Sequence, residues 1–181
     1  SYAVVDDFKG GYKASQYLLQ LGHKNIAGIF KEDDLQGVHR LKGFYQALKD
    51  YGVSPESVDV GTYITSQISS YPYHYMDKLL SHQKKPTAVV CYNDEIAVDV
   101  VKAIVDNDLK VPEDISVVSF DDSILATATN IRLTSVRHPK EELGRHAARL
   151  LFNMIEIGVE KPRFLYDPEL VVRDSCKELR R

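Results

Sequence analysis

Apolar and polar residues follow two different spacings along this chain of 181 residues. Ala14, Tyr17, Leu18 and Leu21 show the i, i+3, i+4, i+7 spacing of a helix with one buried face. Short apolar runs such as residues 87–91 are typical of strands that are buried on both faces. Helical and extended segments alternate throughout, which predicts an α/β fold with a mostly parallel sheet flanked by helices.

Turn residues divide the chain into these elements. Gly22 ends the first helix, Gly52 ends the second, and Pro86 and Pro112 precede strands. A polar loop is expected over residues 31–37, and a long helix over residues 140–157. The expected strands are residues 1–5, 25–30, 58–63, 87–91, 115–120, 133–136, 163–166 and 169–173.

Polar and aromatic side chains follow several of the predicted strands. The loops at the carboxyl ends of parallel strands converge on one crevice, where ligands of such sheets bind. Guanidinium, amide and carboxylate groups hydrogen-bond adjacent hydroxyls, and an aromatic ring packs on the apolar face of a sugar. The residues at these loops therefore favour a polyhydroxylated ligand. The candidate residues at these loops are Lys31, Arg40, Tyr63, Tyr92, Asn93, Asp94, Asp121, Asp122, Arg137 and His138.

Each polar candidate also has a purely structural interpretation. Asn93 stands where it would cap the following helix, and Asp121 is a common turn residue. Arg40 can be a solvated charge at a helix start, and His138 can be a surface residue before a proline. The residue types and their positions leave these alternatives open.

The charge balance argues against direct contact between this segment and DNA. The net charge is -3, the isoelectric point is near 6.1, and lysines and arginines are interspersed with acidic residues. A surface that binds DNA phosphates needs a basic stripe. Cys91 follows an apolar run and is expected as a small core residue in a reducing compartment, which favours the cytoplasm. No apolar run approaches the ~20 residues of a membrane span.

Catalytic motifs are missing from the sequence. There is no G-x-S-x-G nucleophile turn, no phosphate-binding G-x-x-x-x-G-K-[ST] loop and no G-x-G-x-x-G after a strand. The six histidines and two cysteines show no metal-ligand spacing. The sequence therefore predicts a binding protein without catalytic residues, cofactor or metal.

A series of short motifs, in order, resembles the effector-binding region of the LacI/GalR repressor family, which is related in fold to periplasmic sugar-binding proteins. This resemblance implies a type I periplasmic-binding-protein-like fold and assigns sugar contacts to Arg40, Asn93 and Asp121. His138 stands where many relatives have Gln, and Tyr63 falls near an aromatic residue that stacks on the sugar. The matching segments are residues 6–7, 10–11, 21–26, 40–44, 91–97, 111–123 and 133–136.

Three segments resemble a narrower group, the arabinose-responsive repressors of Gram-positive bacteria: residues 29–38, 91–95 and 134–140. Lys31 is a candidate contact on this ground. The resemblance implies L-arabinose as the effector, homodimers, and release of operator DNA by a winged-helix headpiece of the GntR type outside this chain. A periplasmic sugar-binding protein of a transporter is the main alternative, and a sugar-processing enzyme on the same fold is another.

Sensors of this family have two lobes joined by three crossovers, and the chain begins at about the first crossover. We expect residues 6–136 and 167–181 to form the C-terminal lobe, and residues 138–166 to be part of the N-terminal lobe, whose remainder is missing. The apolar face of the helix over residues 140–157 is then expected to be exposed or covered by a partner. That face includes Leu143, Leu150, Leu151 and Met154.

Overall fold

A larger sheet of six strands, in the order β3-β2-β4-β5-β6-β8, organises the chain. The computed structural model describes residues 1–156, 158 and 163–179. Neighbouring strands are parallel except for β6 and β8, which are antiparallel. The strands are β2 (Ile26–Lys31), β3 (Val60–Tyr63), β4 (Ala88–Cys91), β5 (Ser116–Asp121), β6 (Thr134–Arg137) and β8 (Leu170–Val171).

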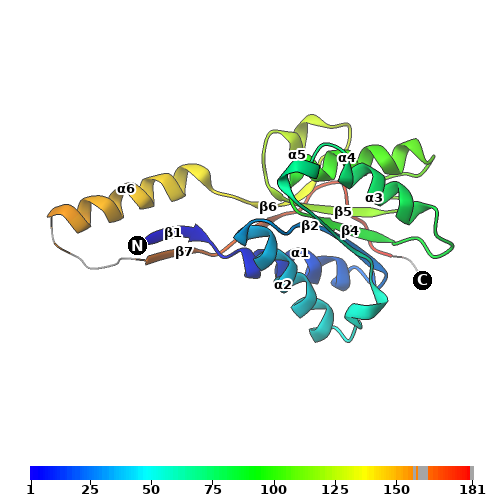
Figure 1. Cartoon of the computed structure of the whole chain (residues 1–181), viewed down its shortest axis with the longest axis horizontal. Coiled ribbons are helices and arrows are strands. Elements are labelled where there is room, and N and C mark those ends of the chain that lie inside the picture. Colours follow the sequence, from blue (N-terminus) through cyan, green and yellow to red (C-terminus); the bar gives the residue numbers. More distant parts are fainter. Residues whose placement is uncertain (157, 159–162, 180–181) are drawn as a thin grey trace.

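Helices cover both faces of this sheet, as Figure 1 shows. Helices α1 (Asp7–Gln20) and α2 (Leu35–Asp50) lie on one face. Helices α3 (Tyr71–Leu80), α4 (Asp94–Asp106) and the short α5 (Leu125–Ala128) lie on the other. Short 3-10 turns at Pro55–Ser57 and Thr65–Gln67 flank β3. This three-layer arrangement confirms the predicted α/β class with a mostly parallel sheet.

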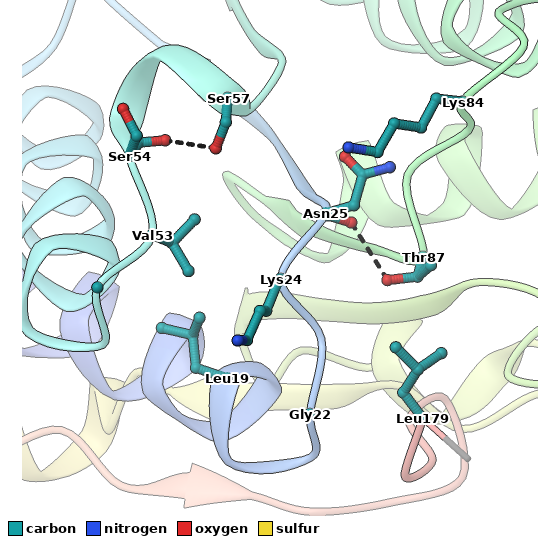
Figure 2. Close-up of a pocket in the computed structure, with 11 residues that line it drawn as sticks. Leu19, Gly22, Lys24, Asn25, Val53, Ser54, Ser57, Lys84, Thr87 and Leu179 are labelled. Atoms are coloured by element: carbon teal, nitrogen blue, oxygen red, sulfur yellow. Dashed lines mark hydrogen bonds between the residues drawn. The ribbon is translucent and has the colours of Figure 1, made fainter. Parts of the chain in front are cut away.

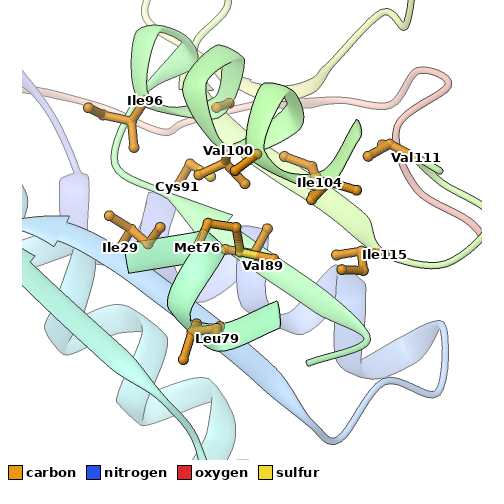
Figure 3. Close-up of a cluster of buried hydrophobic side chains, with 14 of the residues drawn as sticks. Ile29, Met76, Leu79, Val89, Cys91, Ile96, Val100, Ile104, Val111 and Ile115 are labelled. Carbon is orange, nitrogen blue, oxygen red and sulfur yellow. The ribbon is translucent and has the colours of Figure 1, made fainter. Parts of the chain in front are cut away.

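Two apolar cores, one on each face, hold the layers together. All four residues of β4 are buried, because helices pack on both sides of this central strand. Between the sheet and helices α3 and α4, the side chains of Val89, Met76, Val100 and Ile104 interlock (Figure 3). On the opposite face, α1 and α2 pack onto the sheet through a second apolar cluster that includes Leu18, Phe30, Phe44, Leu48 and Val90.

A second, smaller sheet lies apart from the first. Strands β1 (Tyr2–Val5) and β7 (Arg163–Tyr166) pair in parallel, and helix α6 (Lys140–Glu156) packs beside them. These three elements extend away from the main body in Figure 1. Much of the apolar face of α6 is exposed, with side chains such as Leu151 at 56% and Ile155 at 72%. Leu143, expected on the exposed face, is instead buried at the base of the helix.

Several element boundaries differ from the sequence prediction. Helix α2 begins at Leu35, inside the predicted polar loop, because the Asp34 side chain accepts a hydrogen bond from the Gly37 amide and caps it. Strand β8 covers only part of residues 169–173, and α5 was not predicted. The end of the predicted helix 140–157 includes residue 157, which lies outside the described residues. Among the described residues, no helix is long and apolar enough to cross a membrane.

Candidate functional site

Arg40 lies at the centre of the carboxyl edge of the larger sheet. Its side chain is buried, and its Nε donates a 2.8 Å hydrogen bond to Oδ1 of Asp7 at the start of α1. Its Nη1 donates to the main-chain oxygen of Tyr92, at 2.7 Å. Its Nη2 lies 3.5 Å from Oδ1 of Asp121, an ion pair longer than a direct hydrogen bond. The solvated interpretation of Arg40 is therefore wrong, and the guanidinium connects α1, α2, β4 and β5.

Aromatic rings and a close helix contact fix this guanidinium in place. The Arg40 guanidinium carbon lies 5.0 Å from the ring centre of Tyr92 and 4.5 Å from that of Phe120, within range of cation–π attraction. Helix α2 approaches α1 so closely that a Cβ at Gly43 would lie 2.0 Å from the Phe8 carbonyl oxygen. Glycine at this position lets Arg40 reach Asp7.

Asn93 and Asp121 stand at the ends of the neighbouring strands β4 and β5. The side chain of Asn93 accepts a hydrogen bond of 3.0 Å from the Ile96 amide, so it is the N-cap of α4. Asp121 has a φ of 95° and the next residue, Asp122, a φ of 48°, values that residues other than glycine rarely adopt. Non-glycine residues in such conformations concentrate at functional sites. The Asp121 carboxylate is 28% exposed and accessible to a ligand.

His138 follows β6 beside this edge. Its amide donates to the Asp121 carbonyl oxygen at 3.3 Å, and its ring is half-buried. The Nδ1 atom is buried without a hydrogen-bond partner among the described residues. His138 lines two hollows, one of about 560 Å³ that also includes Asp121, and one of about 630 Å³ between β1, α2 and α6. His138 is therefore a candidate contact through the surface that it presents to these hollows.

Lys31 lies at the end of β2 and is held by acidic neighbours. Its Nζ is 3.1 Å from Asp34 Oδ2 and 3.7 Å from Asp33 Oδ1. Asp34 also accepts a 2.7 Å hydrogen bond from the Tyr92 hydroxyl. Burial raises the pKa of the Asp34 carboxyl, but the bonds from Gly37, Tyr92 and Lys31 outweigh this, and its pKa is lowered overall. Lys31 is thus connected to Arg40 through two neighbours: Asp34 binds both Lys31 and the Tyr92 hydroxyl, and the Tyr92 ring lies against Arg40.

Tyr63 lies in the apolar core instead of at the polar edge of the sheet. Its side chain is fully buried, and its ring packs against Tyr71 and Tyr92 at 6.0 and 6.2 Å between centres. Its hydroxyl has no partner among the described residues, and burial raises its pKa. No face of this ring is open to a sugar, so the predicted stacking contact is replaced by a core position beneath Tyr92.

Asp7 was not among the candidate residues and Tyr92 was named only as one of the loop residues, yet both contact Arg40. Asp7 binds Arg40 directly, and Tyr92 supplies both a main-chain oxygen and a ring to it. The sequence offered a signal for each, since Asp7 lies in one of the matching motifs and Tyr92 directly precedes Asn93. Among the described residues, no group of histidine, cysteine and acidic side chains is placed to hold a metal ion.

A hollow of about 800 Å³ lies at the opposite, amino end of the sheet (Figure 2). Its lining combines the exposed lysines Lys24 and Lys84 with Leu19, Val53 and Leu179. Neither of the buried, unpartnered polar atoms of the described chain belongs to a residue that lines this hollow. The convergence of Arg40, Asn93, Asp121 and His138 places the candidate site at the carboxyl edge instead.

An open, mostly parallel sheet with polar groups at its carboxyl edge is the architecture of ligand-binding α/β domains. The model of the periplasmic binding protein-like domain matches residues 15–176, and the chain belongs to this family. The fold expected from the sequence is therefore confirmed.

The chain is similar to two proteins named arabinose metabolism transcriptional repressor. One, from Geobacillus stearothermophilus, is 45% identical over 179 residues, which cover 97% of this chain and 49% of that protein. The other, from Halalkalibacterium halodurans, is 42% identical over 182 residues, which cover 96% of this chain and 48% of that protein. The chain spans about half the length of these relatives.

A solved structure has the same fold. It is a LacI family transcriptional regulator from Enterococcus faecium with bound ribose, 29% identical, with a TM-score of 0.85. The match covers 97% of this chain and 65% of that one. These similarities confirm the predicted relation to the LacI/GalR family.

Proposed function

We propose that this chain is most of the sugar-sensing region of a bacterial transcriptional repressor. It binds a monosaccharide, L-arabinose in the first place, at the carboxyl edge of the larger sheet, and binding releases operator DNA from a headpiece elsewhere in the intact protein. The chain performs no catalysis. The relatives named as repressors support this function over the alternatives of a transport protein and a sugar-processing enzyme.

One observation carries the proposal: the ion pair between Arg40 and Asp121, separated by 3.5 Å at the edge of the crevice. In neither of its two hydrogen bonds does Arg40 use Nη2, the atom nearest Asp121. A sugar hydroxyl both donates and accepts, so it can accept from Nη2 and donate to the carboxylate. In this proposal, Asn93 and His138 contact neighbouring hydroxyls of the same sugar. Lys31 contributes through Asp34, and Tyr63 supports the Tyr92 ring from below.

L-Arabinose is favoured by the names of the two repressors described above and by the narrower sequence resemblance. The structure with ribose shows that a relative of this chain binds another pentose. Specificity within pentoses then depends on which hydroxyls the polar groups at the crevice can reach.

The presence of two separate sheets supports the lobe assignment. Residues 6–136 and 167–181 correspond to the C-terminal lobe, and residues 138–166 to part of the N-terminal lobe. In the intact protein the rest of that lobe covers α6 and β1, where apolar side chains such as Val4, Leu151 and Ile155 are exposed in this chain. Amide hydrogen exchange along α6 tests this assignment, because exchange must be slower in the complete sensor than in the present chain. Equal exchange contradicts the assignment.

The proposed mechanism is a shift between open and closed arrangements of the two lobes. A sugar held between the lobes stabilises the closed form and changes the spacing of two headpieces in a cytoplasmic homodimer. Arg40 is suited to this coupling because it touches both the crevice and Asp7, the first residue of α1 after β1. Sedimentation of the intact protein tests the dimer.

The decisive experiment is isothermal titration of L-arabinose into the complete sensor region, with D-ribose and D-galactose as comparisons. Loss of a charged hydrogen-bond partner costs ~1.5–3 kcal/mol, so Asp121→Ala is expected to weaken binding roughly 10- to 150-fold. Asp174→Ala, which removes an exposed carboxylate at the far end of the sheet, is the matched control. Normal binding by Asp121→Ala contradicts the site, and selective binding of another sugar contradicts arabinose.

A further inference from the structure

Asp94 carries a buried carboxylate directly behind the proposed crevice. It is the first residue of α4, only 1% exposed, and stands next to the capping residue Asn93. Its Oδ1 accepts hydrogen bonds from the hydroxyls of Ser119, at 2.5 Å, and Ser135, at 2.8 Å. Its Oδ2 accepts from the Ser123 amide at 2.7 Å. No lysine, arginine or histidine lies within ion-pair distance of it in the described part of the chain.

The three donors surround the Asp121–Asp122 turn. Ser119 precedes this turn on β5, Ser123 follows it, and Ser135 is the register partner of Ser119 on β6. The Ser135 hydroxyl also accepts a 3.0 Å hydrogen bond from the Asp122 amide. The Asp94 carboxylate therefore bonds a residue on each side of the turn, Ser119 and Ser123. It also reaches the Asp122 amide through the Ser135 hydroxyl.

This turn needs support, because both of its aspartates have positive φ values, 95° and 48°. Non-glycine residues keep such conformations only where surrounding contacts impose them. Asp121 must hold this conformation to keep its carboxylate beside Arg40. Asn93, whose position depends on the first turn of α4, is the direct neighbour of Asp94.

We propose that Asp94 is a positioning residue for the sugar site. It fixes the loop after β4, which carries Asn93, and the loop after β5, which carries Asp121, in one arrangement without contacting the ligand. The expected effect of Asp94 on sugar affinity rests on the proposed function, whereas its effect on the arrangement of the two loops does not.

The test compares four variants of the complete sensor. Asp94→Ala removes the acceptor, and Asp94→Asn keeps the shape and one oxygen. Ser135→Ala removes the hydroxyl that bonds both Asp94 and the Asp122 amide, and leaves the other two donors to Asp94 in place. Ser175→Ala is the matched control: its buried hydroxyl bonds the Thr134 amide and the Val117 carbonyl, near the amino ends of the same two strands. Each variant is measured by L-arabinose titration, by thermal unfolding, and by hydrogen exchange at the Asp122 and Ser123 amides.

We expect Asp94→Ala and Ser135→Ala to weaken arabinose binding about tenfold or more, as loss of a buried hydrogen-bond partner does. In both variants, the hydrogen-exchange rates of the Asp122 and Ser123 amides are expected to rise. Asp94→Asn is expected to show smaller changes in affinity and in exchange than Asp94→Ala. Ser175→Ala lowers the unfolding temperature but leaves affinity and loop exchange unchanged. If Asp94→Ala does not fold, the affinity and exchange measured for Ser135→Ala decide whether the inference holds.

Unchanged affinity and exchange in folded Ser135→Ala and Asp94→Ala overturn the inference, as does an equal loss of affinity in Ser175→Ala. If the wild-type sensor binds no sugar, the proposed function fails. The exchange measurement still decides the inference in that case: faster exchange in Ser135→Ala than in Ser175→Ala supports it, and equal exchange overturns it.

Discussion

The Nε atom of Arg40 donates a 2.8 Å hydrogen bond to Oδ1 of Asp7, and both side chains are nearly inaccessible to solvent, at 3% and 10% exposure. The pair joins the first turn of α1 to the first half of α2 at the point where the chain arrives from β1. A buried ion pair of this kind contributes little net stability while intact but leaves an uncompensated charge when one partner is removed.

Asp7→Ala is therefore expected to destabilise the fold strongly, by about 3–5 kcal/mol, because Arg40 remains buried without its closest carboxylate. Urea unfolding at neutral pH measures this change. Asp174→Ala serves as the control, since its ion pair with Arg132 is solvent-exposed and its loss is expected to leave the unfolding midpoint nearly unchanged. Similar midpoints for both variants would show that the buried pair has no structural importance.

Tyr63→Phe tests the core position of this ring. The hydroxyl is buried without a partner among the described residues, so its removal leaves no group unsatisfied and relieves a desolvation cost of ~1–3 kcal/mol. We expect equal or higher stability and unchanged sugar affinity. Tyr92→Phe is the comparison, because it deletes the bond to Asp34 and is expected to lower stability by ~1 kcal/mol. Weaker sugar binding by Tyr63→Phe would contradict the core position and support a ligand contact at Tyr63.

His23 makes the stability of the fold depend on pH. Burial lowers the pKa of its imidazole below the ordinary value, and its two nitrogens lie 2.9 Å from Thr87 Oγ1 and 3.0 Å from the Lys177 carbonyl oxygen. The unfolded chain then binds a proton at a higher pH than the folded chain does. The contribution of His23 is complete above roughly pH 6.5 and is lost as the pH falls towards the lowered pKa.

Unfolding free energies measured in urea between pH 5.5 and 7.5 are expected to fall on acidification, and His23→Gln should flatten this dependence. His82→Gln, at an exposed position, is the control and should retain the wild-type slope. If the unfolding free energy of His23→Gln changes with pH as it does in the wild type, other groups cause the pH dependence.

The sequence predicted the fold well because the signals were local. The apolar run before Cys91 and the helical spacing after Asn93 each depend on residues a few positions apart, and both match the observed β4 and α4. Asn93, Asp121 and Arg40 were candidates because the loops at the carboxyl ends of parallel strands meet at one edge. The structure joins Arg40 to Asp121 and to Tyr92, the neighbour of Asn93, while the role of these residues in sugar binding stays a prediction.

The burial of Tyr63 and the contacts of Asp94 depend instead on distant residues. The Tyr71 ring that packs against Tyr63 comes from the start of α3, which follows β3 in the chain. Two of the donors to Asp94, Ser119 and Ser135, lie 25 and 41 residues further along the chain. No periodicity in the sequence encodes which hydroxyls meet a given carboxylate after folding.

Asn93 combines a structural role with a proposed ligand contact, and Asn93→Asp separates the two. Aspartate caps helices about as well as asparagine and keeps an oxygen for the Ile96 amide, so the free energy of unfolding should change by less than ~0.5 kcal/mol. The variant lacks the amide donor and adds a negative charge near Asp121, so arabinose affinity should fall by about tenfold. Asn93→Ala is expected to lose both stability, by ~1 kcal/mol, and affinity. Titration and urea unfolding of the two variants provide the comparison. If Asn93→Asp binds arabinose normally while Asn93→Ala is only less stable, the residue is a helix cap and nothing more, and the sugar is held by Arg40, Asp121 and His138.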